Sequence, residues 1–324
     1  MLRSETAATP DRLSAALRGL AAYQAAGREP PPPSLPLCRT HGQARLTGLG
    51  GGGRPVVLIP SLINPSTILD LSEDVSLLRW LSTEGWQAWL LDWGVPTPDE
   101  RGRDIIGHVE TLLVPLLAGF ERPPVAIGYC LGGTIAWAAA ARLPLAGVAT
   151  IAAPWRFSGY GDGRAAMVDL WQGAKPSAEA LGLVPMEVLQ AGFWRLDPKR
   201  TVDKYVAFAD LAPNGAEARA FVRLEDWANA GAPLTYAAGR ELFEDLVAAD
   251  RPGCGSWSCH PATLPCPTVE FVSTTDRIVP AATAAGLADR RDVQAGHVGM
   301  IVGRQRHRLW QALHDWIAAL PATR

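Results

Sequence analysis

The sequence predicts an α/β fold in which a mostly parallel sheet is covered by helices on both faces and carries an inserted helical cap. Short apolar runs alternate with stretches of helical periodicity. Each run is continuous rather than alternating, which is typical of strands buried on both faces. The runs are residues 56–59, 86–91, 125–127, 148–152 and 268–272. Residues 155–260, between the last two runs, are helical in pattern and rich in aromatic side chains, and they predict the cap.

We divide the chain of 324 residues into four segments. Leu13, Leu17 and Leu20 recur at helical spacing, so residues 1–28 are expected to form one amphipathic helix, which the prolines at 30–33 end. Further core helices are expected at residues 69–81, 102–120, 281–288 and 304–319. The segments are an N-terminal helix with a proline linker (1–34), the first part of the core (35–154), the cap (155–262) and the second part of the core (263–324).

Composition and charge exclude several classes of partner. Lys and Arg number 30 against 32 Asp and Glu, with no basic block, so nucleic acid is not expected as a partner. No apolar run reaches the ~18 residues of a membrane-spanning helix, so no transmembrane segment is expected. The five cysteines are an odd set in a chain too large to need disulfide bonds, and the N-terminus lacks a basic-then-apolar signal pattern. A cytoplasmic location is expected.

A metal site is not expected. Cys254, Cys259, His260 and Cys266 are grouped as zinc ligands can be, but their spacing contains no tight pair of the C-x-x-C type.

Residues 125–137 read as a strand, a tight turn and a helix. The apolar strand is cut by Gly128, Cys130 follows, and Gly132 and Gly133 open a helix. In the nucleophile elbow of α/β-hydrolases, a G-x-S-x-G sequence holds the nucleophile in a strained turn above the sheet, and its glycines let strand and helix approach closely. The pattern therefore predicts an α/β-hydrolase fold with Cys130 as nucleophile. By itself it is a weak signal, because a cysteine is also a common small core residue.

A base and an orienting acid follow the cysteine in the chain. Asp276 comes directly after a predicted strand, and His297 lies in a glycine-flanked loop after the last short strand. The order nucleophile, acid, histidine is that of α/β-hydrolases, and parallel strands gather their carboxyl ends at one edge. We therefore predict a triad of Cys130, His297 as base and Asp276. Taken singly, Asp276 could cap a helix starting near Pro280, and His297 could be an ordinary loop histidine.

Backbone amides are expected to hold the oxyanion. The first is the amide of Leu131, directly after the nucleophile, and the second comes from the loop after residues 56–59, with Leu62 and Ile63 as candidates. Pro60 has no N–H. The alternative is that this loop only connects a strand to a helix.

Several motifs resemble those of polyhydroxyalkanoate synthases. Residues 128–133, Gly-Tyr-Cys-Leu-Gly-Gly, resemble the G-x-C-x-G-G box of that family, and residues 221–227 resemble the cap of its short members, which work with a second subunit. The resemblance spans about residues 55–300. Further matching stretches are residues 60–64, 68–71, 76–81, 91–94, 276–280 and 296–299.

The resemblance implies a reaction. Carried over position by position, it makes Cys130 the nucleophile, His297 the base and Asp276 its partner, with (R)-3-hydroxyacyl-coenzyme A as acyl donor and a hydroxyl as acceptor. No cofactor is implied, because the coenzyme A thioester is a substrate. It also implies as partners a second synthase subunit or a homodimer, and the surface of a polymer granule in the cytoplasm.

The thiol itself favours transfer over hydrolysis. An acyl group on a cysteine sulfur keeps nearly the bond energy of the thioester from which it came, so it stays activated for an alcohol. Two alternatives remain open. One is a hydrolase (thioesterase, esterase or polyhydroxyalkanoate depolymerase) on the same triad, and the other is a non-catalytic granule or assembly protein.

Two lesser groups have a functional and an ordinary interpretation. Asp92 ends a predicted strand, where it either touches the site or binds its own backbone. Arg304, Arg306 and Arg308 either form a solvated helix face or receive the coenzyme phosphates.

Overall fold

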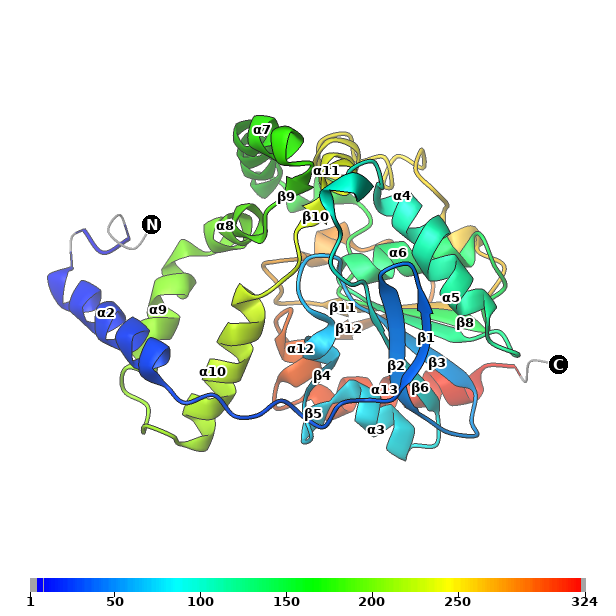
Figure 1. Cartoon of the computed structure of the whole chain (residues 1–324), viewed down its shortest axis with the longest axis horizontal. Coiled ribbons are helices and arrows are strands. Elements are labelled where there is room, and N and C mark those ends of the chain that lie inside the picture. Colours follow the sequence, from blue (N-terminus) through cyan, green and yellow to red (C-terminus); the bar gives the residue numbers. More distant parts are fainter. Residues whose placement is uncertain (1–4, 8, 322–324) are drawn as a thin grey trace.

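A central sheet organises the molecule, as the computed structural model in Figure 1 shows; it describes residues 5–7 and 9–321. Within these residues the sheet has eight strands in the order β1-β2-β6-β3-β7-β8-β11-β12. The strands from β6 to β12 pair in parallel, and β1 and β2 add an antiparallel edge. The mostly parallel sheet predicted from the sequence is confirmed. The strands are β1 (Leu37–His41), β2 (Ala44–Gly50), β3 (Pro55–Ile59), β6 (Gln87–Asp92), β7 (Val125–Tyr129), β8 (Gly147–Ile151), β11 (Thr268–Ser273) and β12 (Arg290–Val293).

Both faces of the sheet are buried, which explains the continuous apolar runs. Strand β3 sends Val57 and Ile59 into one apolar cluster and Val56 and Leu58 into the other. One cluster lies under α4, α5 and α6, and the other under α3, α12 and α13, on opposite sides of the sheet (Figure 1). These helices are α3 (Leu77–Thr83), α4 (Ile105–His108), the π-helix η3 (Val109–Leu113), α5 (Val114–Ala118), α6 (Leu131–Ala140), α12 (Gly299–Val302) and α13 (Arg306–Ala319).

Two of the expected helices are shorter than predicted. In place of a helix over residues 69–81, a 3₁₀ turn η1 (Ser66–Leu69) leads into a hairpin of β4 (Asp70–Ser72) and β5 (Val75–Ser76). Helix α3 begins only after Ser76, whose hydroxyl accepts a hydrogen bond from the amide of Arg79 at 2.9 Å.

The expected helix over residues 281–288 is only the 3₁₀ turn η7 (Ala281–Thr283). The amides of Ala285 and Leu287 donate instead to the buried carboxylate of Glu270, at 3.0 and 2.7 Å. A charged acceptor from β11 therefore replaces the helical carbonyls.

A largely helical block lies between β8 and β11, as the aromatic-rich stretch predicts. The exact segment boundaries drawn from the sequence stay an interpretation. The block contains η4 (Phe157–Tyr160), α7 (Gly163–Leu181), β9 (Leu183–Val184), α8 (Met186–Leu196), α9 (Pro198–Phe208), α10 (Ala216–Asn229), β10 (Leu234–Thr235), α11 (Tyr236–Arg240), the π-helix η5 (Glu241–Ala248) and η6 (Pro261–Thr263).

The N-terminal helix packs differently from the leucine pattern that predicted it. Helix α2 (Pro10–Ala25) begins at Pro10, where proline suits the first helical turn, and it lies along the outside of α9 (Figure 1). Its buried residues are Ala16 and Gly19, whereas the Leu17 side chain is 48% exposed. Part of the stretch ahead of Pro10 lies outside the described residues.

Candidate active site

Cys130 occupies a strained turn between β7 and α6. Its φ is +56°, a conformation in which side-chain-bearing residues are uncommon. The neighbouring glycines allow the close packing: a Cβ on Gly128 would lie 2.3 Å from the Cα of Gly133, and a Cβ on Gly132 would lie 2.2 Å from the carbonyl oxygen of Ile59. The strand, turn and helix that the sequence predicted are present at this position.

The structure brings the other two predicted triad residues together. Nδ1 of His297 lies 2.6 Å from Oδ2 of Asp276, and both side chains are buried. The other carboxylate oxygen, Oδ1, accepts hydrogen bonds from the amides of Ile278 and Val279 at 2.7 and 3.0 Å. Asp276 is thereby fixed in orientation, and it fixes the imidazole in turn.

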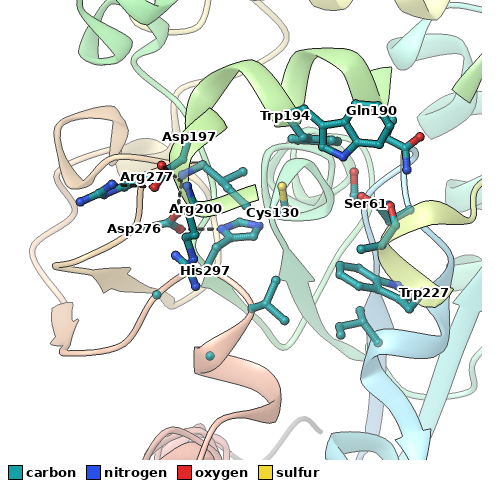
Figure 2. A pocket seen from close by; sticks show the side chains of 18 of the residues that line it. Ser61, Cys130, Gln190, Trp194, Asp197, Arg200, Trp227, Asp276, Arg277 and His297 are labelled. Atoms are coloured by element: carbon teal, nitrogen blue, oxygen red, sulfur yellow. Dashed lines mark hydrogen bonds and ion pairs between the residues drawn. The ribbon is translucent and has the colours of Figure 1, made fainter. Parts of the chain in front are cut away.

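His297 also interacts with Cys130. Burial lowers the pKa of His297, but the charges of Cys130 and Asp276 and hydrogen bonds to both side chains outweigh it and raise the pKa to about 10. The imidazole therefore holds its proton at neutral pH between a carboxylate and a sulfur. Figure 2 shows Asp276, His297 and Cys130 in this order across the pocket.

The three candidate oxyanion amides differ in availability. Leu131 is the first residue of α6, where an amide has no helical acceptor. Within the described residues, the amides of Leu131 and Leu62 have no hydrogen-bond acceptor, whereas the amide of Ile63 donates to the hydroxyl oxygen of Ser61 at 3.1 Å. The amides of Leu131 and Leu62 are therefore without an acceptor while that of Ile63 is engaged, and of the first two residues only Leu131 lines a pocket beside Cys130.

Cys130 opens into a pocket of about 320 Å³ between the core and the cap. Figure 2 shows two walls on either side of the sulfur. One wall carries charged side chains, and the other carries aromatic, amide and hydroxyl side chains. The first wall contains Asp197, Arg200, Asp276, Arg277 and His297, and the second contains Ser61, Gln190, Trp194 and Trp227.

The cations of this pocket were not found by sequence reasoning. Arg277 pairs with Asp197 at 2.6 Å, and Lys204 pairs with the buried Glu225 at 2.6 Å. Arg200 has no side-chain partner among the described residues, so it is the cation of this pocket left for a ligand. No local signal marks these residues, because the fold alone decides which face of α9 meets the core.

The lesser candidates lie away from the pocket. Asp92 binds Arg45 at 2.7 Å and accepts from the amide of Gly94 at 2.9 Å, so it holds its own turn. None of the arginines at 304, 306 and 308 lines the pocket. Within residues 5–7 and 9–321, no three His, Cys, Asp or Glu side chains are placed to hold a metal ion, and no helix is long and apolar enough to cross a membrane.

The chain is similar in sequence to polymerase subunits. It is 27% identical to the poly(3-hydroxyalkanoate) polymerase subunit PhaC of Haloferax mediterranei, over 82% of this chain and 58% of that protein. It is 23% identical to the PhaC subunit of Haloarcula marismortui, over 81% of this chain and 60% of that protein. It is also 23% identical to the PhaC subunit of Synechocystis, over 82% of this chain and 77% of that protein. The chain thus spans less than two thirds of the length of the Haloferax and Haloarcula relatives. No protein-family model matches the chain.

Solved structures give the fold. An N-acyl homoserine lactonase, AidH, aligns with a TM-score of 0.53 and 14% identity, and epoxide hydrolase A from Mycobacterium thermoresistibile with 0.52 and 17%. Each alignment covers 90% of this chain and 100% of the other. These likenesses show the fold alone. The chain thus has an α/β-hydrolase fold, and its sequence is similar to that of the poly(3-hydroxyalkanoate) polymerase subunits, as the resemblance in its motifs indicated.

Proposed function

We propose that this protein is an acyltransferase that takes an (R)-3-hydroxyacyl group from a coenzyme A thioester onto Cys130 and passes it to a hydroxyl. The observation that carries the proposal is the buried Asp276–His297 pair, which meets a cysteine held in a nucleophile elbow. The name of the relatives, poly(3-hydroxyalkanoate) polymerase subunit, supports acyl transfer that forms a polyester.

In the first half-reaction, the Cys130 sulfur attacks the thioester carbonyl carbon. Negative charge then develops on the carbonyl oxygen, where the amides of Leu131 and Leu62 donate hydrogen bonds. The bond from the carbonyl carbon to the coenzyme A sulfur breaks, and that sulfur takes the proton held by His297. The acyl group remains on Cys130.

In the second half-reaction, a hydroxyl attacks the acyl carbonyl. Neutral His297 accepts the hydroxyl proton, and Asp276 stabilises the imidazolium that forms. A new ester bond forms as the bond to the Cys130 sulfur breaks, which restores the starting pair of thiolate and imidazolium. Repetition with the product hydroxyl as acceptor builds a polyester, provided that the cap keeps water from the acyl-enzyme.

The name of the relatives also supports assembly, because each is called a subunit. We therefore include a second synthase subunit, or a second copy of this chain, and a granule surface among the proposed partners. Light scattering on the purified chain, alone and after incubation with substrate, tests the self-association.

The decisive experiment incubates the purified protein with 3-hydroxybutyryl-coenzyme A and measures both thiol release and product mass. Ester-linked oligomers are expected. Free 3-hydroxybutyrate as the product would instead identify a hydrolase, and no thiol release from the wild type would favour a non-catalytic protein. Cys130→Ala should abolish thiol release with the fold intact. Cys266→Ala is the matched control, because Cys266 does not line the pocket. This variant should still release the thiol.

A further inference from the structure

Cys130 also lines a second, smaller pocket. It measures about 90 Å³ and shares Cys130, Phe193 and Ile278 with the larger pocket. The rest of its wall comes from the core on one side and from α7, α8 and η5 of the cap on the other. A group bonded to the Cys130 sulfur can therefore extend in either of two directions.

The two directions differ in chemistry. The larger pocket has charged side chains on its wall, whereas among the side chains that the structure describes no acidic or basic one lines the smaller pocket. Its polar side chains are Cys130 itself and the hydroxyl of Tyr160, and burial raises the pKa of Tyr160 well above its ordinary value, so that hydroxyl stays neutral. The smaller pocket favours an apolar group and disfavours a charged one.

The oxyanion residues connect the reaction to the smaller pocket. Leu131 lines the smaller pocket and not the larger one, and so does Ile63, next to Leu62. The proposed oxyanion donor Leu131 therefore borders the smaller pocket, which leaves this pocket within reach of the alkyl chain of an acyl group on Cys130. The charged carrier then remains on the side of Arg200.

We propose that the smaller pocket is the acyl-chain site, that it selects short acyl groups, and that Gly192 and Leu170 set its depth. This inference rests on the proposed function, whose site it deepens. A space of about 90 Å³ equals roughly three water molecules, which suits acyl groups of about four to six carbons.

Gly192 on α8 and Leu170 on α7 lie close together in the wall of the smaller pocket. A Cβ added at Gly192 would come within 3.1 Å of Cδ2 of Leu170. Gly192→Ala therefore narrows the pocket while favouring the helix, and Leu170→Ala widens it. Gly173→Ala is the matched control, because Gly173 lies on α7 with nothing within 4 Å of its added Cβ.

The first test compares kcat/KM for the 3-hydroxybutyryl, 3-hydroxyhexanoyl and 3-hydroxyoctanoyl thioesters of coenzyme A. Each buried methylene changes a rate roughly fourfold, so Leu170→Ala should raise the octanoyl-to-butyryl ratio by roughly tenfold or more. Gly192→Ala should lower the hexanoyl-to-butyryl ratio by roughly fourfold. Gly173→Ala should change neither ratio. Ratios that are equal in all the variants would overturn the inference.

A second test does not depend on acyl transfer. In a Cys38→Ser, Cys254→Ser background, which removes the exposed thiols, Cys130 is alkylated with N-methyl, N-butyl and N-octyl iodoacetamide. The butyl reagent should react fastest, Leu170→Ala should favour the octyl reagent, and Gly192→Ala should favour the methyl reagent. This pattern without any thioester turnover would refute the proposed function and keep the apolar site. Turnover with no chain-length dependence in either test would refute the apolar site alone.

Discussion

Cys130 differs from the other cysteines in both its backbone and its neighbours. It adopts a positive φ beside a buried histidine, whereas Cys38 and Cys254 are exposed and Cys259 and Cys266 pack against the apolar core. A strained backbone and a paired imidazole at one residue are typical of a reactive site, because packing alone requires neither.

Selective alkylation should separate these thiols. Burial raises the pKa of Cys259 to about 12, so this thiol stays protonated and unreactive near neutral pH, whereas Cys130 faces the imidazolium of His297. In the Cys38→Ser, Cys254→Ser background, iodoacetamide should modify Cys130 and leave Cys259 intact. His297→Gln should slow the reaction at Cys130 by roughly tenfold. Peptide mass spectrometry measures both, and equal labelling of Cys259 would contradict the expectation.

Arg200 should matter for the charged part of the substrate. It lines the larger pocket without a side-chain partner among the described residues, so Arg200→Gln should raise KM for a coenzyme A thioester by roughly fivefold. The N-acetylcysteamine thioester of the same acyl group lacks phosphates, and its KM should not change. Lys199→Gln, on the neighbouring position of α9 and outside the pocket lining, is the control. An equal effect on both thioesters would contradict a role in phosphate binding.

At the scale of elements, helix α9 is held from two sides. On the inner side Asp197, which also caps the helix through the amide of Arg200, pairs with Arg277, the residue after Asp276. On the outer side Arg12 of α2 binds Asp203 at 2.7 Å, and Tyr23 donates to Asp226 of α10 at 2.6 Å. The N-terminal helix therefore braces the cap helices that line the larger pocket.

Gly19→Ala should weaken the packing of α2 on α9. Alanine ordinarily stabilises a helix interior by about 1 kcal/mol, but here its Cβ would lie 1.8 Å from the carbonyl oxygen of Tyr205. The close α2–α9 packing must open, and the free energy of unfolding should fall by about 1 to 3 kcal/mol. Trypsin should then cleave faster at Arg28, in the linker after α2. Gly27→Ala, with nothing within 4 Å of its Cβ, should behave as the wild type. A variant more stable than the wild type would contradict the packing.

At the scale of the whole molecule, the cap lies above a core that is apolar on both sheet faces, and the buried polar groups in that core must stay satisfied or neutral. His108 of α4 is one of them. Burial lowers its pKa, its Nδ1 lies 2.7 Å from the carbonyl oxygen of Asp104, and its ring meets the edge of Trp93. The folded protein therefore keeps this imidazole neutral.

The stability of the fold should consequently fall in mild acid. Below the ordinary histidine pKa of 6.5 the unfolded chain binds a proton at His108 that the folded chain does not, so acidification favours unfolding. Between about pH 5.5 and 6.5 the free energy of unfolding should fall by up to about 1 kcal/mol for each pH unit of acidification. In His108→Gln this dependence on pH should be weaker. His297 acts in another window: its raised pKa contributes stability that is complete below 6.5 and is lost as the pH rises toward about 10. Urea unfolding at about pH 5.5, 6.5 and 7.5 measures the free energy of unfolding. The same dependence on pH in the wild type and in His108→Gln would contradict the role of His108.

The sequence by itself determined the sheet and the elbow. Continuous apolar runs locate the parallel strands because a strand buried on both faces has no polar side. The glycines around Cys130 locate the elbow because the close approach of β7 and α6 excludes a Cβ. The pairing of Asp276 with His297 could also be predicted, since the carboxyl ends of parallel strands meet at one edge.

Only the tertiary structure decided which other side chains surround Cys130. It shows that Ser61 engages the amide of Ile63, that Arg200 faces the larger pocket, and that Gly192 and Leu170 bound the smaller one. Likewise, Glu270 replaces an expected helix by binding two amides far along the chain. The positions of Arg200, Gly192 and Leu170 depend on how the cap packs on the core. The hydrogen bond to Ser61 is local, and those to Glu270 form within the core, so the side chains that accept them were not evident from helical or strand periodicity.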